Sequence, residues 1–436
     1  MIMLSCHFML DVPMPDGSKR ELKDAVPFSE VYIHALVRDA DRQKMSKTKG
    51  NVIDPIEIVQ KYGTDAVRFT LASMASPGTD IAFSEARTEG YRAFANKIWN
   101  AARFLFMQID RAKEAGYAVD PASLREALKP ASSTGGAAGS EKTASLPWTL
   151  PENTPLETRW IFTRLSAVSA EVNRALTDYR FDEAANAIYQ FFWGEFCDWY
   201  LELVKLRLEF GEGTEKNQTA ALTLASLVSV FESALRLLSP FMPFLTEEIW
   251  HALYNDATPA KSIALTHYPL AANFPADAVV EIESAMKTLQ DLIVIIRGLR
   301  KDLGVPEKES TPVQLHAANR ILALADANSD MLARMARVQV VEFASEPLTG
   351  SNARSTAEFD VAVVYERQID VAAERERLAK DLAKFEKGLT AAERQLNNEA
   401  FMAKAPAHIV DGLRKQAAET KLLYDKTKAA LDSLPE

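Results

Sequence analysis

The chain has 436 residues, which is too long for one ordinary domain and predicts roughly two to four domains. It is 47% hydrophobic and 25% charged, which excludes a disordered chain, and no apolar run is long enough for a membrane span. The formal charge of −10 excludes nucleic-acid binding through bulk charge, so any such contact must rest on local basic patches.

The first part of the chain is typical of the end of an α/β unit. The apolar start, Met1–Leu10, lacks a basic flank and a cleavage site, which favours a buried helix end over a signal peptide. "VYIHALV", residues 31–37, is short, apolar and β-branched, and predicts a buried strand. Beyond residue 53, Asp54 and Pro55 predict a helix start, Gly63 a break, and Thr64 the cap of a second helix.

Between these elements lies a strongly basic loop, "RQKMSKTKGNVIDP", residues 42–55. It holds three lysines within six residues, together with Ser46, Thr48 and Gly50. Loops that leave the C-terminal end of a parallel strand bind nucleotides in α/β folds, and ammonium groups there can stabilise the charge that builds on a leaving pyrophosphate. The alternative is a solvated turn, because runs of charge usually face solvent.

The middle of the chain is predicted to be helical. A long helix over residues 84–109 carries apolar side chains at helical spacing: Phe94, Ile98, Ala101, Leu105 and Ile109. Residues 118–150 are small, polar and glycine-rich, and predict a flexible insertion. Four helical segments, 157–177, 181–210, 217–238 and 243–253, then predict an antiparallel bundle.

One helix of this bundle is rich in aromatic side chains. They could form a stacking platform for RNA bases, but their helical spacing favours the core of the bundle. The residues concerned are Tyr189, Phe192, Trp193, Phe196, Trp199 and Tyr200.

The C-terminal third divides into two patterns. Helices at 282–303 and 329–337 alternate with strands at 311–318, 338–344 and 359–365, which predicts a small α+β unit. From residue 371 onward, apolar residues repeat at spacings of four and three on both sides of Pro406, which predicts an antiparallel coiled-coil hairpin.

Several motifs together resemble a known family. "KMSKT" followed by "KGNVIDP" is similar to the second signature of class I aminoacyl-tRNA synthetases. "EGYRAFANKIWNAARF", "FDEAANAIYQFFWGEFCDWYLELVK" and "LSPFMPFLTEEIWHAL" resemble the junction helix and anticodon-binding bundle of the branched-chain synthetases. "LNNEAFMAKAPAHIV" resembles the arm of valyl-tRNA synthetases. The resemblance covers nearly the whole chain except residues 118–150.

The resemblance implies a role for the basic loop. Lys44 and Lys47 would be catalytic and would contact the triphosphate of ATP, with Lys47 the stronger candidate, while Ser46 and Thr48 would complete the ATP-binding loop. Thr48 stands where the family usually has serine and keeps the hydroxyl. The implied partners are ATP with Mg²⁺, valine and tRNA(Val), and no protein-bound metal is expected.

The resemblance also implies a fold that is mainly α. It comprises the end of a Rossmann-like α/β catalytic domain, an anticodon-binding helix bundle, a small α+β unit and a C-terminal antiparallel coiled-coil hairpin. The expected boundaries are 1–75 for the catalytic part, 76–117 for a connecting helical segment, 118–150 for the insertion, 151–275 for the bundle, 276–368 for the α+β unit and 369–436 for the tRNA-binding arm.

Cations outside the loop are candidates for contact with tRNA phosphates. Three lie near the bundle, at Lys97, Arg103 and Arg180, and four lie on the outward face of the first arm helix, at Lys380, Lys384, Lys387 and Arg394. Ordinary surface cations are the alternative reading in each case. Cys6 beside His7 has no partner at ligand spacing, which favours a structural role, and two distant cysteines suit a reducing cytoplasm.

The family's other signature, HIGH, does not occur in this sequence. We therefore expect the chain to correspond to the C-terminal half of a synthetase, to be unable to activate valine alone, and to have the missing N-terminal half as a possible partner. An exposed apolar surface around Met1–Leu10 would follow. Two alternatives stay open: a stand-alone, non-catalytic tRNA-binding module, and a fragment of an isoleucyl or leucyl relative.

Overall fold

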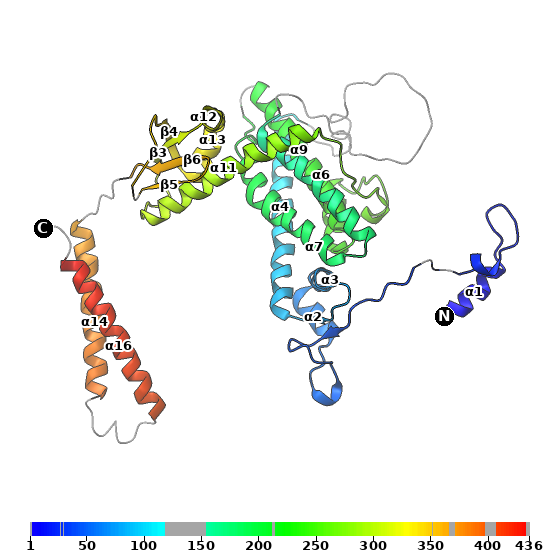
Figure 1. Ribbon diagram of the computed structural model, residues 1–436, viewed down its shortest axis with the longest axis horizontal. Coiled ribbons are helices and arrows are strands. Elements are labelled where there is room, and N and C mark those ends of the chain that lie inside the picture. The colour runs from blue at the N-terminus through cyan, green and yellow to red at the C-terminus, as the bar shows by residue number, and fades with distance from the viewer. Residues whose placement is uncertain are drawn as a thin grey trace.

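A computed structural model describes residues 2–26, 28, 30–117, 154–211, 214–350, 352–365, 371–396 and 407–432. The insertion expected at residues 118–150 lies outside these ranges. Helices make up the middle of the chain, and a small sheet and a pair of long helices follow towards the C-terminus (Figure 1).

The N-terminal part forms less regular structure than its sequence predicts. Helix α1 (Ile2–Leu10) and the 3₁₀ turn η1 (Leu22–Asp24) lead through extended chain to β1 (Val37–Arg38), which pairs in parallel with β2 (Ile81–Ala82). The prediction of a strand over residues 31–37 is therefore wrong, except at Val37, which lies in β1. Val31 and Ile33 are 83% and 84% exposed. Within the described residues no neighbouring strand lies beside them, and a strand needs such a neighbour to satisfy its backbone.

The surface of α1 follows the expectation drawn from the sequence. Met3, Leu4 and Phe8 are all mostly exposed. This confirms an apolar surface near the N-terminus, and it corrects the reading of Met1–Leu10 as a buried helix end.

Two short helices follow the basic loop. Asp54 caps α2 (Pro55–Tyr62) by accepting a hydrogen bond from the backbone N–H of Ile56 at 2.8 Å, as predicted. Gly63, with φ of 88°, separates α2 from α3 (Thr64–Ser73). The prediction that Thr64 caps α3 is wrong, because Gly63 occupies the N-cap and Thr64 is already the first helical residue.

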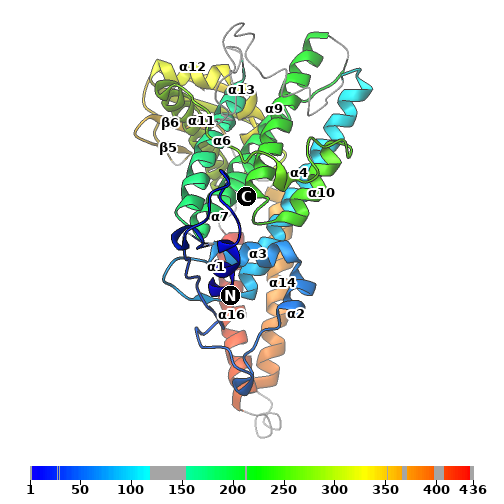
Figure 2. The same cartoon turned by 90° about the vertical axis from the view of Figure 1, so that its right-hand side faces the viewer.

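The bundle contains long helices that pack on one another. They are α4 (Glu85–Glu114), α6 (Leu156–Thr177), α7 (Phe181–Tyr189), the π-helix η3 (Gln190–Tyr200), α8 (Leu201–Val204), α9 (Thr214–Leu238) and α10 (Pro243–Leu253). Figure 2 shows α4, α9 and α10 as neighbours. The helix expected over 181–210 ends at Val204 and is a π-helix in its middle. A 3₁₀ turn, η4 (Ile263–Leu265), closes the bundle.

The predicted core positions of the bundle are confirmed. All five apolar positions singled out on the long helix are buried in α4. Phe192, Phe196 and Tyr200 are fully buried, which supports the core reading of the aromatic stripe over a stacking platform. Tyr189 and Trp193 are half-buried against the same core.

Helix α9 passes a test for membrane-spanning length and composition. Within the described residues it is the one helix that does so, over Lys216–Leu238, and 89% of its most apolar stretch is buried inside the bundle. Its apolar character therefore follows from its place at the centre of the bundle.

The small unit is a mixed sheet with helices. The order of its strands is β4-β3-β6-β5; β3 pairs in parallel with β4, and the other pairs are antiparallel. It comprises α11 (Ala276–Asp302), β3 (Thr311–Ala317), α12 (Asn319–Ala327), α13 (Ser329–Ala336), β4 (Val338–Phe343), β5 (Ala353–Ser355) and β6 (Phe359–Val363). Helix α12 and strand β5 were not expected from the sequence.

The C-terminal helices form the expected hairpin. Helices α14 (Val371–Leu396) and α16 (Ala407–Asp432) run side by side in Figure 1 and pack on each other. Leu378, Ala392 and Val410 are buried between them. The proline-bearing tip at residues 397–406 lies outside the described residues.

Truncation of a side chain at the contact between α3 and the bundle tests this packing. Phe69→Ala should destabilise the folded chain by about 3–5 kcal/mol, because truncation leaves a cavity among buried aromatic rings. Phe244→Ala is the control and should change stability by about 0.5 kcal/mol or less, because its ring is 65% exposed. Guanidinium unfolding followed by tryptophan fluorescence measures both. Equal losses in the two variants would contradict the assignment of Phe69 to the core.

Candidate functional site

The basic loop begins at a turn organised by Asp39, directly after β1. The carboxylate of Asp39 accepts a hydrogen bond from the backbone N–H of Gln43 at 2.7 Å, and the backbone N–H of Arg42 donates to the carbonyl of Asp39 at 3.0 Å. Arg42 has φ of 60°, in the left-handed region. The turn reverses the chain immediately before Lys44.

Asn51 closes the loop from its other end. Its side-chain oxygen accepts from the backbone N–H of Ser46 at 2.9 Å, and its Nδ2 donates to the Asp39 carboxylate at 2.7 Å and to the carbonyl of Lys44 at 3.3 Å. The hydrogen bond from Asn51 lowers the pKa of the Asp39 carboxyl group, with the Gln43 N–H as the next contribution. One amide therefore ties both ends of the loop together.

Sequence reasoning missed Asp39 and Asn51. A signal for them existed, since Asp and Asn commonly bond nearby backbone groups at turns, and these two flank the lysine run. What the sequence could not indicate is that they bond each other across 12 residues.

The predicted hydroxyl residues differ in their environment. Ser46 caps the 3₁₀ turn η2 (Lys47–Lys49) by accepting from the backbone N–H of Lys49 at 3.2 Å, and Gly50 ends the turn with φ of 69°. A Cβ at Gly50 would be strained by that backbone conformation. Thr48 is exposed and makes no side-chain hydrogen bond within the part of the chain that the structure describes.

The two predicted catalytic lysines lie in this loop, Lys44 before η2 and Lys47 at its first residue. Lys44 and Lys47 are both exposed, and neither forms an ion pair with any described residue. Lys49 differs, because its Nζ lies 3.4 Å from the side-chain oxygen of Gln43. The Asp39 carboxylate also interacts with the charge of Lys49, whereas no described carboxylate pairs with Lys44 or Lys47. The loop thus presents the ammonium groups of Lys44 and Lys47 to solvent, which suits a polyanionic ligand.

The three cations near the bundle are used in different ways. Lys97 forms an ion pair with Asp198, and its Nζ lies 4.1 Å from the centre of the Trp193 ring. Arg180 pairs with Asp182 at 3.2 Å and with Glu183 at 2.9 Å. Arg103 is exposed and has no ion pair with the described residues.

The four arm cations are exposed on α14, as the sequence predicts. Lys387 and Arg394 lie along the same shallow groove as Glu386 and Thr390. The groove therefore carries both acidic and basic side chains. The spacing of its two cations, Lys387 and Arg394, places them on one face of the helix.

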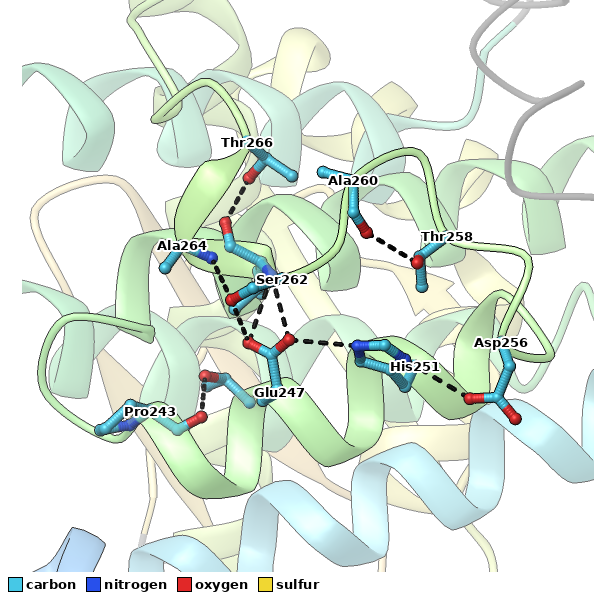
Figure 3. A network of polar contacts seen from close by, with 11 residues as sticks. Pro243, Glu247, His251, Asp256, Thr258, Ala260, Ser262, Ala264 and Thr266 are labelled. Carbon is cyan, nitrogen blue, oxygen red and sulfur yellow. Dashed lines mark hydrogen bonds and ion pairs between the residues drawn. The ribbon is translucent and has the colours of Figure 1, made fainter.

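A polar network on α10 superficially resembles a catalytic constellation (Figure 3). Glu247 accepts from the hydroxyl of Ser262 at 2.9 Å and lies 3.1 Å from Nε2 of His251, whose Nδ1 lies 3.4 Å from Asp256. The serine bonds the carboxylate and not the imidazole, so the order of contacts differs from that of a serine–histidine–carboxylate triad. Glu247 also accepts from the backbone N–H of Ile263, so the network fastens η4 to α10.

Other reactive groups have structural surroundings. Burial raises the pKa of the Cys197 thiol to about 12, which removes it as a nucleophile at neutral pH. Among the residues that the structure describes, no group of three His, Cys, Asp or Glu side chains could hold a metal ion.

Three family models match parts of this chain. Residues 6–84 match "tRNA synthetases class I (I, L, M and V)", residues 158–315 match "Anticodon-binding domain of tRNA ligase", and residues 370–435 match "Valyl tRNA synthetase tRNA binding arm". The basic loop falls in the first region and the four arm cations fall in the third.

Curated relatives match most of the chain. A valine–tRNA ligase of Solibacter usitatus is 41% identical over 92% of this chain and 40% of its own length. The valine–tRNA ligase of Geobacter sulfurreducens is 37% identical over 100% of this chain and 44% of its own length. The chain thus spans less than half the length of these relatives.

Among solved structures, LeuRS of Agrobacterium radiobacter K84, in a ternary complex with tRNA and LeuAMS, is 22% identical. The similarity covers 59% of this chain and 26% of that one, with a TM-score of 0.36. A likeness of this size carries no argument about the site.

Removal of the Asn51 amide tests the organisation of the loop. Asn51→Ala should speed hydrogen exchange of the Ser46 amide about fivefold to tenfold, because that N–H loses its acceptor. Asp41→Ala, an exposed side chain in the same turn, is the control and should leave exchange unchanged. NMR measures the hydrogen-exchange rate of the Ser46 amide. The same rate in the Asn51→Ala variant and in the unaltered chain would contradict the proposed closure of the loop by Asn51.

Proposed function

This chain belongs to the valine–tRNA ligase family of class I aminoacyl-tRNA synthetases, and we propose that it supplies that enzyme's triphosphate-binding lysine loop and its tRNA-binding surfaces. The complete enzyme would activate valine with ATP and transfer it to tRNA(Val) in the cytoplasm. The observation that carries the proposal is the loop itself, in which Asn51 and Asp39 hold two unpaired lysines on a fixed turn.

The lysines act by electrostatics. During valine activation the carboxylate attacks the α-phosphate of ATP, and negative charge builds on the departing pyrophosphate. Ammonium groups from Lys47 and Lys44 stabilise that charge, and a preformed loop does so without a further cost of reorganisation. Ser46 holds the turn from within, and Thr48 presents the hydroxyl that the ATP-binding loop carries at this position. ATP would arrive with Mg²⁺ as part of the substrate, and the loop's cations and hydroxyls fit its phosphates.

The loop provides only part of an ATP site. The HIGH signature does not occur in the sequence, and the chain spans 40% of the length of its Solibacter relative. We propose that the remainder of the site comes from the N-terminal region that such relatives carry. The exposed apolar side chains of α1 and of residues 31–36 are available to pack against it.

The bundle and the arm would bind tRNA(Val). Their family models describe anticodon-binding and tRNA-binding functions, which supports tRNA as the partner. Among the three predicted cations of the bundle, Arg103 forms no ion pair with the described residues and is free to bind a phosphate. Lys97 and Arg180 would first have to leave their carboxylate partners. On the arm, Lys384 and Lys387 are spaced to follow one face of α14.

A stand-alone tRNA-binding module is the second candidate. It would explain the bundle and the arm, but it leaves the closed lysine loop without a purpose. The arm model is valyl, which speaks against the isoleucyl or leucyl alternative.

Exchange of pyrophosphate into ATP tests the catalytic part. The chain alone should show no valine-dependent exchange. Together with the N-terminal part of the Solibacter relative, the chain should catalyse valine-dependent exchange. In that mixture Lys47→Ala should lower the exchange rate by about 100-fold or more. Lys49→Ala is the matched control from the same loop and should cost about fivefold or less, because the Asp39 carboxylate already interacts with the charge of Lys49. Equal effects of the two substitutions would sink the assignment.

Charge reversal tests the arm. The double variant Lys384→Glu, Lys387→Glu should weaken binding of tRNA(Val) and reduce the slope of log affinity against log salt by about 2, because two phosphate contacts are lost. The double variant Lys19→Glu, Lys23→Glu changes the net charge equally on exposed positions outside the bundle and the arm, and should leave the slope unchanged. An unaltered slope in the arm variant contradicts the contact.

A further inference from the structure

A group of cations on the α+β unit is not used by the functions proposed above. Arg297 and Lys301 lie on α11, Arg334 lies on α13, and Arg337 is the residue that ends α13. All four side chains are exposed. The last two also lie within residues 316–369, which none of the three matching family models covers.

Two hydrogen bonds bring these cations together at the C-terminal end of α13. Arg297 donates from Nε to the carbonyl of Met335 at 2.6 Å, and the buried Arg300 donates to the carbonyl of Arg337 at 3.4 Å. Lys301 follows Arg300 directly and lies one turn beyond Arg297 on α11. Cations from both helices therefore form one surface, called here the α13 patch: Arg297, Lys301, Arg334 and Arg337.

The carboxylates closest to the α13 patch in the sequence have other partners. Asp302 pairs with Arg354 at 3.0 Å, and Asp330 pairs with Arg207. No acidic residue occurs between residues 331 and 341. Within the described residues no side chain of the α13 patch forms an ion pair. The patch therefore keeps its positive charge, although acidic residues outnumber basic ones in residues 276–365 as a whole.

The surroundings of Arg300 confirm that positive charge gathers here. Burial lowers the pKa of Arg300; the charge of Glu309 opposes that shift, and the charge of Arg337 adds to it. Glu309 thus offsets the buried cation, and the exposed cations around it have no such counter-charge. Like charges held close together repel one another, and a bound anion relieves that repulsion.

The shape of the α13 patch indicates which anion suits it. Its side chains are exposed on two helices and do not enclose a space, whereas a site for a small anion surrounds its ligand. Several exposed cations without partners suit an extended polyanion, which replaces its counterions with them along its backbone. The α+β unit also joins the bundle to the arm in the chain, so an RNA that contacts both has this unit beside it.

We propose that the α13 patch binds backbone phosphates of tRNA(Val), as a third contact besides those of the bundle and the arm. The proposal rests on the tRNA binding proposed above and adds a surface outside the two regions named there. The contact is to phosphates, so it contributes affinity and orientation and does not read the bases.

Fluorescence anisotropy of labelled tRNA(Val) with the full chain, over a series of salt concentrations, tests the α13 patch. The double variant Arg334→Gln, Arg337→Gln should weaken binding and reduce the slope of log affinity against log salt by about 2, because two phosphate contacts are lost. Lys301→Gln should reduce it by about 1. The double variant Lys19→Gln, Lys23→Gln removes two charges at exposed positions outside the patch and should leave the slope unchanged.

Thermal unfolding shows whether each variant is folded. Lys301→Gln changes an exposed side chain and keeps the test valid if the double variant unfolds. Combined with Lys384→Glu, Lys387→Glu, the double patch variant should give about the sum of the two slope changes, because distant contacts act independently.

The outcomes separate this proposal from the function on which it rests. An unaltered slope in the folded patch variants, while the arm variant lowers it, overturns the patch contact and leaves tRNA binding by the arm standing. An equal reduction in the Lys19→Gln, Lys23→Gln control also overturns the contact, because the effect then follows net charge alone. Absence of tRNA(Val) binding by the unaltered chain overturns both proposals.

Discussion

The ring of Phe69 joins the lysine-bearing end of the chain to the helix bundle. It is fully buried, and the rings of Tyr91, Phe94, Tyr189 and Phe241 surround it at centroid distances of 4.8 to 6.4 Å. These rings come from α4, α7 and the residues before α10. Because aromatic packing of this density permits little relative motion, α3 and the bundle behave as one body.

Polar contacts reinforce the same joint. Asp65 on α3 accepts the backbone N–H groups of Phe244 and Leu245 at the start of α10, at 3.3 and 2.6 Å, and Arg68 donates to the carbonyl of Pro240 at 3.0 Å. Burial raises the pKa of Asp65, while the two N–H groups oppose that shift. A second link runs from Ser76 to Asp182 at 2.5 Å. The loop that would touch ATP is therefore only one short helix away from the part that would touch tRNA.

Charge in this protein is organised locally. The chain carries a net charge of −10, and two of the cations predicted from the sequence to contact RNA are neutralised by carboxylates within the fold. These two are Lys97 and Arg180. Lys44 and Lys47 differ, because the hydrogen bonds of their loop join backbone, amide and Asp39 and leave the two ammonium groups unpaired. Selective pairing thus separates structural cations from those available to a ligand.

The sequence by itself determined the long helices, the hairpin and the position of the lysine loop, because these depend on spacing within one segment. Periodic apolar residues on α4 and the aromatic stripe were placed correctly in the core for this reason. The tertiary structure decided whatever depends on a partner distant in the chain. Residues 31–34 have strand composition but no adjacent strand among the described residues, so they form no strand, and Val31 and Ile33 stay exposed. The closure of the loop by Asn51 and the pairing of Lys97 with Asp198 arise in the same way. Each depends on which groups folding brings within hydrogen-bonding distance, and spacing along one segment does not specify that.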